Sequence, residues 1–184
     1  MMLKKFIVGI LSVALSVSAL SCKKASMANN ESEHQAINRV EMLFKQGANT
    51  IATIVAEDPD GDGGNPPSRI DNINLEINKT YDVEVKFFNI SNGVSKDITP
   101  LILQQGKQHE VFFILTGFGF TIEKKDKDDS GFPLGLLSQW RTGTVGGKGS
   151  ILVKLMHKPL IKGPNDDAFK GHSDVAISFP LNLN

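Results

Sequence analysis

Apolar side chains recur at every second position in this sequence, and that period decides the fold class. Residues 81–87 read Tyr-Asp-Val-Glu-Val-Lys-Phe, with apolar side chains at the odd positions only. The same alternation runs through 73–77 and 175–183. Successive side chains of a strand point to opposite faces of its sheet, so these segments each have one face to bury. They predict half-buried β-strands.

Several further segments are strand-like and are separated by clusters of Gly, Pro, Asn and Asp. This spacing predicts an all-β fold, a single antiparallel, immunoglobulin-like β-sandwich. No segment has the period of a helix of three turns. Pro180 predicts an edge position within the last strand, because proline cannot donate to a ladder. The further strands are expected at 40–44, 50–56, 98–103, 110–115, 118–123 and 151–156.

The N-terminal segment has the features of an export signal. Two lysines, Lys4 and Lys5, precede an apolar run at 6–20, and the small Ser21 stands directly before Cys22. This pattern resembles the lipobox of bacterial lipoproteins and predicts a signal peptide at 1–21 and a lipid thioether, with palmitate-type chains, on Cys22. An uncleaved membrane anchor is the alternative. The apolar run is shorter than the roughly 20 residues that span a bilayer, which favours the lipoprotein.

Cleavage before Cys22 would define the mature protein. The whole chain has 20 basic and 20 acidic residues, and cleavage removes two lysines and no acids. The mature chain then has 18 basic and 20 acidic residues, a net charge of −2. A nearly neutral chain argues against nucleic acid as a partner. The sole cysteine is used by the lipid, so no disulfide is expected. We predict a flexible tether at 22–36 and one sandwich domain at 37–184.

Two acidic loops carry the most suggestive chemistry. Both fit the opening of a calcium loop, in which oxygens at alternate positions converge on one cation while glycine permits a sharp turn. Neither is an EF-hand, because the twelfth positions are Arg69 and Leu137 and the flanks are strand-like. The calcium ligands expected are Asp58, Asp60 and Asp62 in the first loop and Asp126, Asp128 and Ser130 in the second.

A calcium shell in either loop would need further ligands. Backbone carbonyls, or a distant carboxylate such as Glu57 or Asp71, are candidates. The alternative interpretation is turn chemistry alone, because Asp, Gly, Asn and Pro are the residues of tight turns between strands.

The two loops also suggest an internal repeat. An offset of 68 residues pairs Asp58 with Asp126 and Phe44 with Phe112. This spacing predicts two similar half-domain units that face each other as a sandwich. The alternative is chance similarity between strands that share Val, Thr and Gly.

Two other patterns have weaker chemical meaning. Residues 143–149 are glycine-rich but lack the spacing and the following helix of a phosphate loop, so we expect a hairpin turn. His109, His157 and His172 are expected at strand edges, where a transition-metal site would require the fold to bring them together. No nucleophile elbow, zinc-protease or dinucleotide motif occurs.

Several segments of the domain resemble those of small lipoproteins found in Bacteroidetes, a group without an agreed activity. Some members carry the label "type 1 periplasmic binding fold superfamily". That label implies two α/β lobes, which the length and strand pattern of this chain exclude. The resemblance implies an envelope lipoprotein and is carried by 58–64, 109–113, 126–136, 155–159 and 171–175.

These patterns leave two classes of function. The first is a lipid-anchored envelope sandwich, binding or structural and not an enzyme, which contacts the membrane through Cys22 and recognises an envelope protein or glycan, with calcium bracing its loops. The second is an envelope hydrolase that holds a catalytic metal in its acidic loops. A soluble ligand-transport protein is disfavoured by size. Lys23 after the cysteine favours the outer membrane, by resemblance to enterobacterial sorting, with the domain in the periplasm or at the surface.

Overall fold

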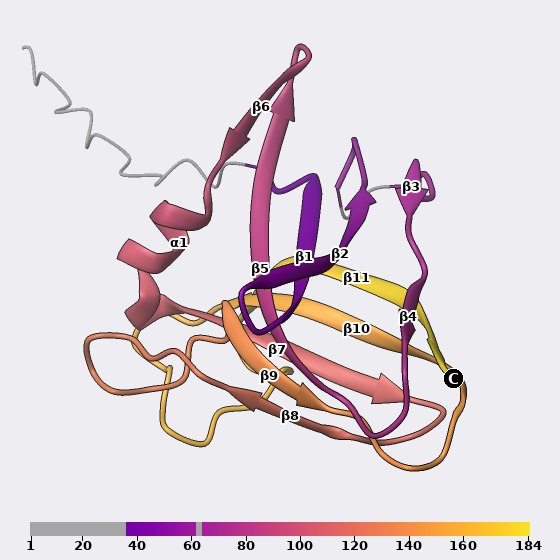
Figure 1. The fold of residues 1–184 in the computed structure, drawn as a ribbon. Helices are drawn as coiled ribbons and strands as arrows, with labels where there is room; N and C mark the ends of the chain where they lie inside the picture. Colours follow the sequence, from indigo (N-terminus) through magenta and orange to yellow (C-terminus); the bar gives the residue numbers. More distant parts are fainter. Residues whose placement is uncertain (1–35, 62–63) are drawn as a thin grey trace, which may run out of the picture. The chain divides into compact units, whose positions relative to one another are not determined.

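The computed structural model describes residues 36–61 and 64–184 (Figure 1). The expected signal peptide at 1–21, Cys22 and the tether lie outside the described residues, except for Ala36. Within the described residues no helix is long and apolar enough to cross a membrane.

Alternating strands form two sheets, and the first is built around the long strand β5. In the described part of the chain this sheet has seven strands, all in antiparallel pairs. Their order is β3 (Arg69–Ile70), β2 (Asn49–Glu57), β1 (Arg39–Gln46), β5 (Thr80–Ser91), β9 (Leu137–Arg141) and β8 (Thr121–Lys124), and β6 (Val94–Asp97) pairs with the far end of β5.

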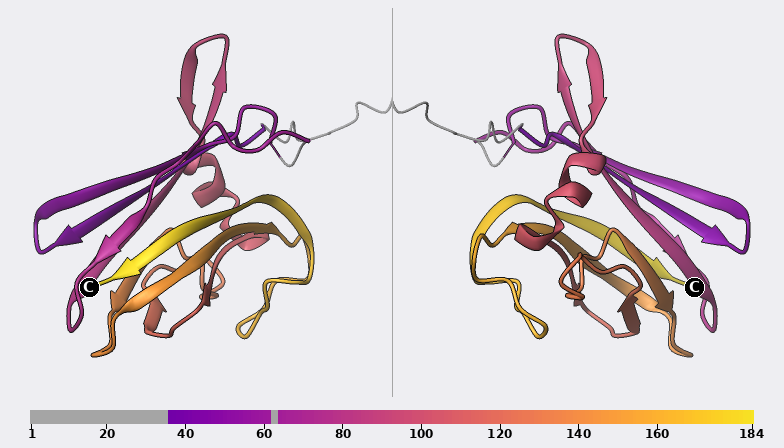
Figure 2. Two further views of the ribbon diagram at one scale, coloured as in Figure 1. Left: turned by 90° about the vertical axis from the view of Figure 1, so that its right-hand side faces the viewer. Right: turned by 90° about the vertical axis from the view of Figure 1, so that its left-hand side faces the viewer.

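The second sheet has four strands among the described residues and packs on the first as a sandwich (Figure 2). Its pairs are antiparallel except β4 with β11, which run parallel. The order is β4 (Ile73–Leu75), β11 (His172–Leu183), β10 (Gly147–His157) and β7 (His109–Thr116). The predicted all-β sandwich is therefore confirmed.

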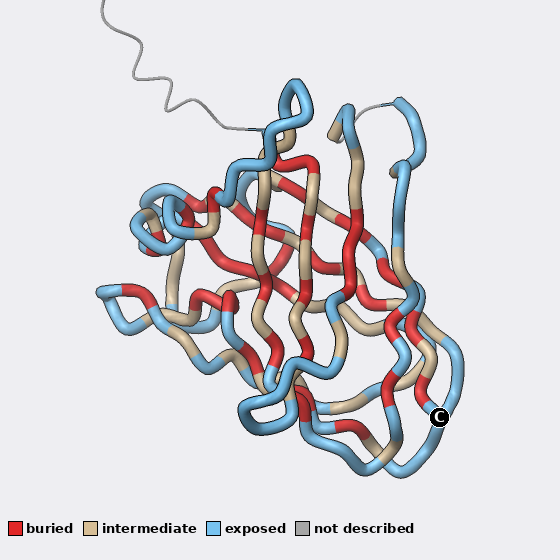
Figure 3. The backbone as a smooth tube through the Cα atoms, turned by 45° about the horizontal axis from the view of Figure 1, so that its top comes forward, coloured by how far each residue is buried: buried red, intermediate tan, exposed pale blue. Residues whose placement is uncertain are grey.

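The core lies between the two sheets, and buried residues from the long strands of both sheets form it (Figure 3). Trp140 of β9 is fully buried at its centre. Its ring meets those of Phe44 and Phe113 edge-on, with centroids 5.2 and 5.5 Å away, and its Nε1 donates to Ser138 Oγ at 2.9 Å. Edge-to-face rings and a satisfied indole N–H are the arrangement that stabilises a buried tryptophan.

A helix closes one end of the sandwich. The short helix α1 (Thr99–Gln104) and the 3-10 turn η1 (Gly106–Gln108) connect β6 to β7. The predicted strand at 98–103 is therefore wrong. Pro100 lies in the first turn of α1, where its missing N–H costs nothing, and Ile98 and Ile102, four residues apart, share the face that enters the core.

We call this the helix end of the sandwich. The described chain begins there, since Asn38 N donates to Phe88 O at 3.1 Å and Ile98 N donates to the neighbouring Phe87 O at 2.9 Å. Strand β7 also begins there, β10 ends there and β11 begins there, because His157 pairs with both His109 and His172. The opposite end carries the connections at 47–48, 76–79, 117–120 and 142–146.

The other strand predictions differ from the structure in detail. The strand expected at 118–123 begins only at Thr121. Strand β9 was not predicted. Its two buried residues are Ser138, which is polar, and Trp140, so the strand has no alternating apolar pattern. Pro180 lies where β11 pairs only with β10, since β4 begins its pairing at Leu181. At Pro180, β11 therefore has a free edge on the β4 side, as predicted, although farther along β11 is paired on both sides.

The two half-units are not reproduced by the strand pairing. In the first half β1 pairs with β2 in the same sheet. The corresponding strands of the second half separate, because β7 pairs with β10 while β8 joins β9 in the other sheet. The connection at 117–120 makes this crossing at Gly117, whose φ of +100° suits glycine.

The glycine-rich segment 143–149 is also a crossing between sheets rather than a hairpin. It leads from β9 to β10, and its glycines allow close backbone contact. A Cβ on Gly146 would lie 2.6 Å from Leu183 O, and one on Gly149 would lie 2.2 Å from Thr116 O. Both positions therefore require glycine.

Candidate functional site

The first acidic loop follows β2 at the helix end. Gly61 N donates to Asp58 O at 3.1 Å, and Asp60 Oδ2 accepts from the backbone N and the side-chain amide of Asn65 at 3.2 and 2.8 Å. The Asn65 amide holds the pKa of Asp60 below its usual value. Asp62, the third expected ligand, lies outside the described residues. The Asp58–Gly61 contact is that of a β-turn, and the Asp60–Asn65 contacts close the rest of the loop.

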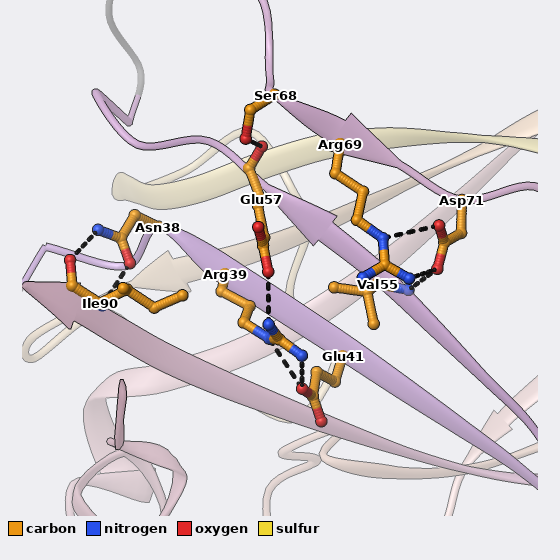
Figure 4. Close-up of polar contacts among 9 residues, drawn as sticks. All are labelled: Asn38, Arg39, Glu41, Val55, Glu57, Ser68, Arg69, Asp71 and Ile90. Atoms are coloured by element: carbon orange, nitrogen blue, oxygen red, sulfur yellow. Dashed lines mark hydrogen bonds and ion pairs between the residues drawn. The ribbon is translucent and has the colours of Figure 1, made fainter. Parts of the chain in front are cut away.

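The two carboxylates expected to complete a calcium shell are engaged by arginines (Figure 4). Glu57 accepts from Arg39 Nη1. Asp71 accepts from Arg69 Nε and Nη2 at 2.9 and 2.8 Å and from Val55 N at 2.9 Å. The Arg69 guanidinium holds the pKa of Asp71 below its usual value, although partial burial opposes the shift. These charges are already matched and anchor β3 to β2.

The carboxylates of the second acidic loop are engaged as well. Asp126 accepts from Gly135 N and Leu136 N at 2.7 and 2.9 Å. Asp128 Oδ1 accepts from Ser130 N and Phe132 N at 2.8 and 3.0 Å. Calcium would have to compete with these backbone donors, so the geometry favours the turn interpretation here.

The remaining oxygen of Asp128 binds a buried lysine. Its Oδ2 lies 2.8 Å from Lys162 Nζ, and both side chains are 1 % exposed. Burial favours the neutral acid, but the Lys162 ammonium and the backbone N–H groups overcome it and hold the pKa of Asp128 below its usual value. Lys162 Nζ also donates to Gly106 O at 2.7 Å, which connects the loop to η1.

A second buried ion pair lies beside the first. Lys158 is fully buried; its Nζ lies 2.9 Å from Asp166 Oδ1 and also donates to Asp167 O. Burial again opposes ionisation, yet Lys158 holds the pKa of Asp166 below its usual value. The pair joins the start of the connection between β10 and β11 to a residue in its second half.

Phe112 lies at the centre of this charged cluster, on the outer face of β7. The ammonium groups of Lys124 and Lys158 lie 4.0 and 4.6 Å from the centroid of its ring. Lys124 Nζ also donates to Glu110 Oε1 at 2.5 Å. Burial raises the pKa of Glu110 and lowers the pKa of Lys124, so this pair is pushed toward its neutral forms. Cations over an aromatic face stabilise the charges that burial disfavours.

The three predicted histidines do come together at the start of β7 and β11. The rings of His109 and His157 stack with centroids 4.8 Å apart. Asp174 lies between imidazoles, with its Oδ2 3.3 Å from His109 Nε2 and its Oδ1 3.4 Å from His172 Nδ1. Burial opposes ionisation of Asp174, but His109 holds its pKa below the usual value.

This arrangement favours an ion pair over a metal centre. His109 Nδ1 contacts Gln105 O at 3.1 Å while Nε2 faces Asp174, so both ring nitrogens of a nearly buried imidazole face acceptors. Both contacts are hydrogen bonds only when both ring nitrogens carry a proton or when Asp174 does. Across residues 36–61 and 64–184 no group of three metal-ligating His, Cys, Asp or Glu side chains is found.

The segment between β10 and β11, which we call the 158–171 loop, carries the most exposed apolar side chains. Leu160 is 103 % exposed, Phe169 80 % and Ile161 56 %. Leu160 adopts a φ of +65°, a conformation that leucine rarely takes. The loop is held from below by the two buried ion pairs, and Lys158 N donates to Gln108 O at 2.6 Å.

The sequence contained a signal for this loop that the periodicity analysis missed. Leu160 and Ile161 are adjacent apolar residues in a segment otherwise rich in Pro, Gly, Asn and Asp, where no strand or helix would bury them. The buried charges of Lys158 and Lys162 have no such signal, because lysine is almost always exposed.

A shallow hollow of about 240 Å³ lies on the other sheet, lined by Lys45, Glu84 and Leu137 among others. None of the lysines and carboxylates of the charged cluster lines it.

No protein-family model matches the sequence, and a comparison with curated proteins finds no significant match. The resemblance to Bacteroidetes lipoproteins stays a prediction.

Proposed function

We propose that this protein is a lipid-anchored module of the bacterial cell envelope, a docking domain rather than an enzyme. The anchor is the lipid on Cys22, and the outer membrane is its expected location. The sequence pattern at 4–22 supports the anchor. The docking element is the 158–171 loop.

The observation that carries the docking role is the combination of exposure and bracing in that loop. Exposed apolar side chains are costly unless a partner covers them. Here they stand on a loop whose base holds two ion pairs with side chains at most 7 % exposed. A loop that is ordered before binding loses less conformational entropy when it docks.

The charged cluster supports this role better than catalysis. Its lysines and carboxylates are paired with one another, and they connect the loop to η1 and to the second acidic loop. A metal-dependent hydrolase would need carboxylates that are available to a cation, whereas Glu57, Asp71 and Asp128 are engaged by cationic side chains. The docking role is therefore our first proposal, and a metal-dependent hydrolase that uses Asp58 and Asp60 is the alternative.

Calcium stays a narrower proposal for the first acidic loop, with Asp58 and Asp60 as the described ligands. If it binds there, millimolar calcium raises the melting temperature, because a ligand that prefers the native state stabilises it. Asp60→Asn should remove that rise.

The anchor is tested by labelling cells with radioactive palmitate. The wild-type chain should incorporate the label, and Cys22→Ser should not. A wild-type chain that stays unlabelled, or a Cys22→Ser chain that takes up the label, would show that the lipobox assignment is wrong.

A further inference from the structure

We infer that the 158–171 loop docks on the lipid bilayer itself, so that the helix end of the domain faces the membrane. This inference rests on the proposed lipid anchor for its orientation. It adds a second, protein-mediated membrane contact to the one at Cys22.

The shape of the loop favours a bilayer as the occupant. A side chain that is 103 % exposed, as Leu160 is, has no neighbouring group over it and stands at a convex tip. Phe169 and Ile161 add apolar surface beside it in the same loop. A convex apolar tip needs a concave pocket on a protein partner, whereas a fluid bilayer accommodates it without a matched shape.

Nearby surface extends this apolar area. Helix α1 exposes Leu103 at 58 % and Leu101 at 38 %. The loop is joined to the segment that follows α1 through Lys162 Nζ and Gly106 O, 2.7 Å apart. Loop and helix therefore belong to one end of the sandwich.

The described chain begins at this same end of the sandwich. Asn38 pairs with the end of β5, next to the start of α1. Only 13 residues lie between Cys22 and Ala36, so the two can be no farther apart than about 50 Å even when this segment is fully extended. A lipid on Cys22 would hold the helix end near the bilayer, and a tethered second contact gains from the high effective concentration that such a link provides.

The bracing explains how the loop keeps its apolar side chains outside. Without support, Leu160, Ile161 and Phe169 would collapse onto the outer face of the four-stranded sheet, where Phe112 and Met156 form a small cluster with Ala168. Lys158 occupies the space beside Phe112 and binds Asp166, and Lys162 binds Asp128. The ion pairs thus fix the loop in its projecting form.

The experiment measures vesicle flotation of the mature chain carrying Cys22→Ser, which has no lipid of its own. The vesicles contain phosphatidylethanolamine with a minor share of phosphatidylglycerol. We expect the chain to float with them, and Leu160→Ser/Ile161→Ser/Phe169→Ser to lose at least about tenfold in partitioning. The matched control is Ile51→Ser/Val145→Ser, which removes side chains that are 49 % and 74 % exposed at the opposite end and should change nothing.

The inference is overturned if the unlipidated chain does not float, or if the loop variant floats as well as the control. Binding of the loop to an envelope protein without any binding to vesicles would also overturn it. Thermal unfolding of the loop variant should match that of the parent, because the three side chains are exposed. If that variant fails to fold, Phe169→Ser alone is the second test and should lower partitioning by several-fold. Palmitate labelling of Cys22 is a separate readout, so failure of the anchor and failure of the loop can be told apart.

Discussion

Removing the charge of Lys162 tests whether buried ion pairs hold the 158–171 loop. In Lys162→Met the Asp128 carboxylate stays buried and loses the ammonium 2.8 Å away. Breaking a buried pair by removal of one partner costs about 3–5 kcal/mol. Asp128 keeps its bonds from Ser130 N and Phe132 N, so we expect the lower limit, about 3 kcal/mol.

The assay is urea unfolding, with the melting temperature as a second measure. A loss of about 3 kcal/mol corresponds to a fall of about 6–12 °C for a domain of this size. The matched control is Lys170→Met in the same loop. Lys170 is 73 % exposed and pairs with Asp167 at 3.5 Å, so its loss should cost less than about 0.5 kcal/mol.

Two results would refute the reasoning. One is a loss below about 1 kcal/mol in Lys162→Met, which would mean that the pair gives no net support in this setting. The other is an equal loss in Lys170→Met. A double-mutant cycle with Asp128→Asn then measures the coupling, because residues in direct contact should not be additive.

Three further predictions concern Asp128, Asp174 and Gly149. Folding lowers the pKa of Asp128, so its ion pair stabilises the fold at pH values above the unfolded pKa of 3.8, and this stabilisation is lost as the pH falls through the folded pKa. In acid titrations the difference in unfolding free energy between wild type and Lys162→Met should therefore narrow below pH 3.8. Asp174→Asn should lower the unfolding free energy in urea by about 2 kcal/mol, because it removes the carboxylate beside the nearly buried His109. His172→Ala, at a side chain that is 76 % exposed, should lower it by less than about 0.5 kcal/mol, and equal losses in the two variants would contradict this. Gly149→Ala should cost about 3 kcal/mol or more, since its Cβ would meet Thr116 O at 2.2 Å, while Gly163→Ala meets nothing within 4 Å and should leave the melting temperature almost unchanged.

Period-two alternation predicted β4, β5 and β11. Burial alternates along much of β1, β5, β10 and β11, whereas β2 and β7 bury consecutive residues. The pattern failed where packing is not periodic. Segment 98–103 is apolar enough for a strand, but Pro100 starts a helical turn that places Ile98 and Ile102 in the core.

The pairing of strands could not be derived from local pattern. The offset of 68 residues is real in the sequence, yet β7 and β8 belong to different sheets because the chain crosses between them after Thr116. Which sheet a strand joins depends on contacts distant in sequence, and short strands such as β8 and β9 carry too few residues to specify them.

The candidate site was only partly accessible to sequence analysis. The acidic loops were found, but their residues gave no sign that Asp128 would pair with Lys162, 34 positions later. The three histidines were recognised as a group that the fold would have to assemble. Their role as neighbours of Asp174 depends on the register of β7, β10 and β11, which no single segment encodes.

The most direct test of the account places a fluorescent probe on the loop. Cys22 is the only cysteine, so Leu160→Cys in the Cys22→Ser chain can be labelled at one position with an environment-sensitive dye. We predict that vesicles of phosphatidylethanolamine with a minor share of phosphatidylglycerol shift its emission to the blue and increase its intensity, while the same dye at Val145→Cys, at the opposite end, does not respond. No change at position 160, or an equal change at both positions, would contradict docking of the 158–171 loop on the bilayer.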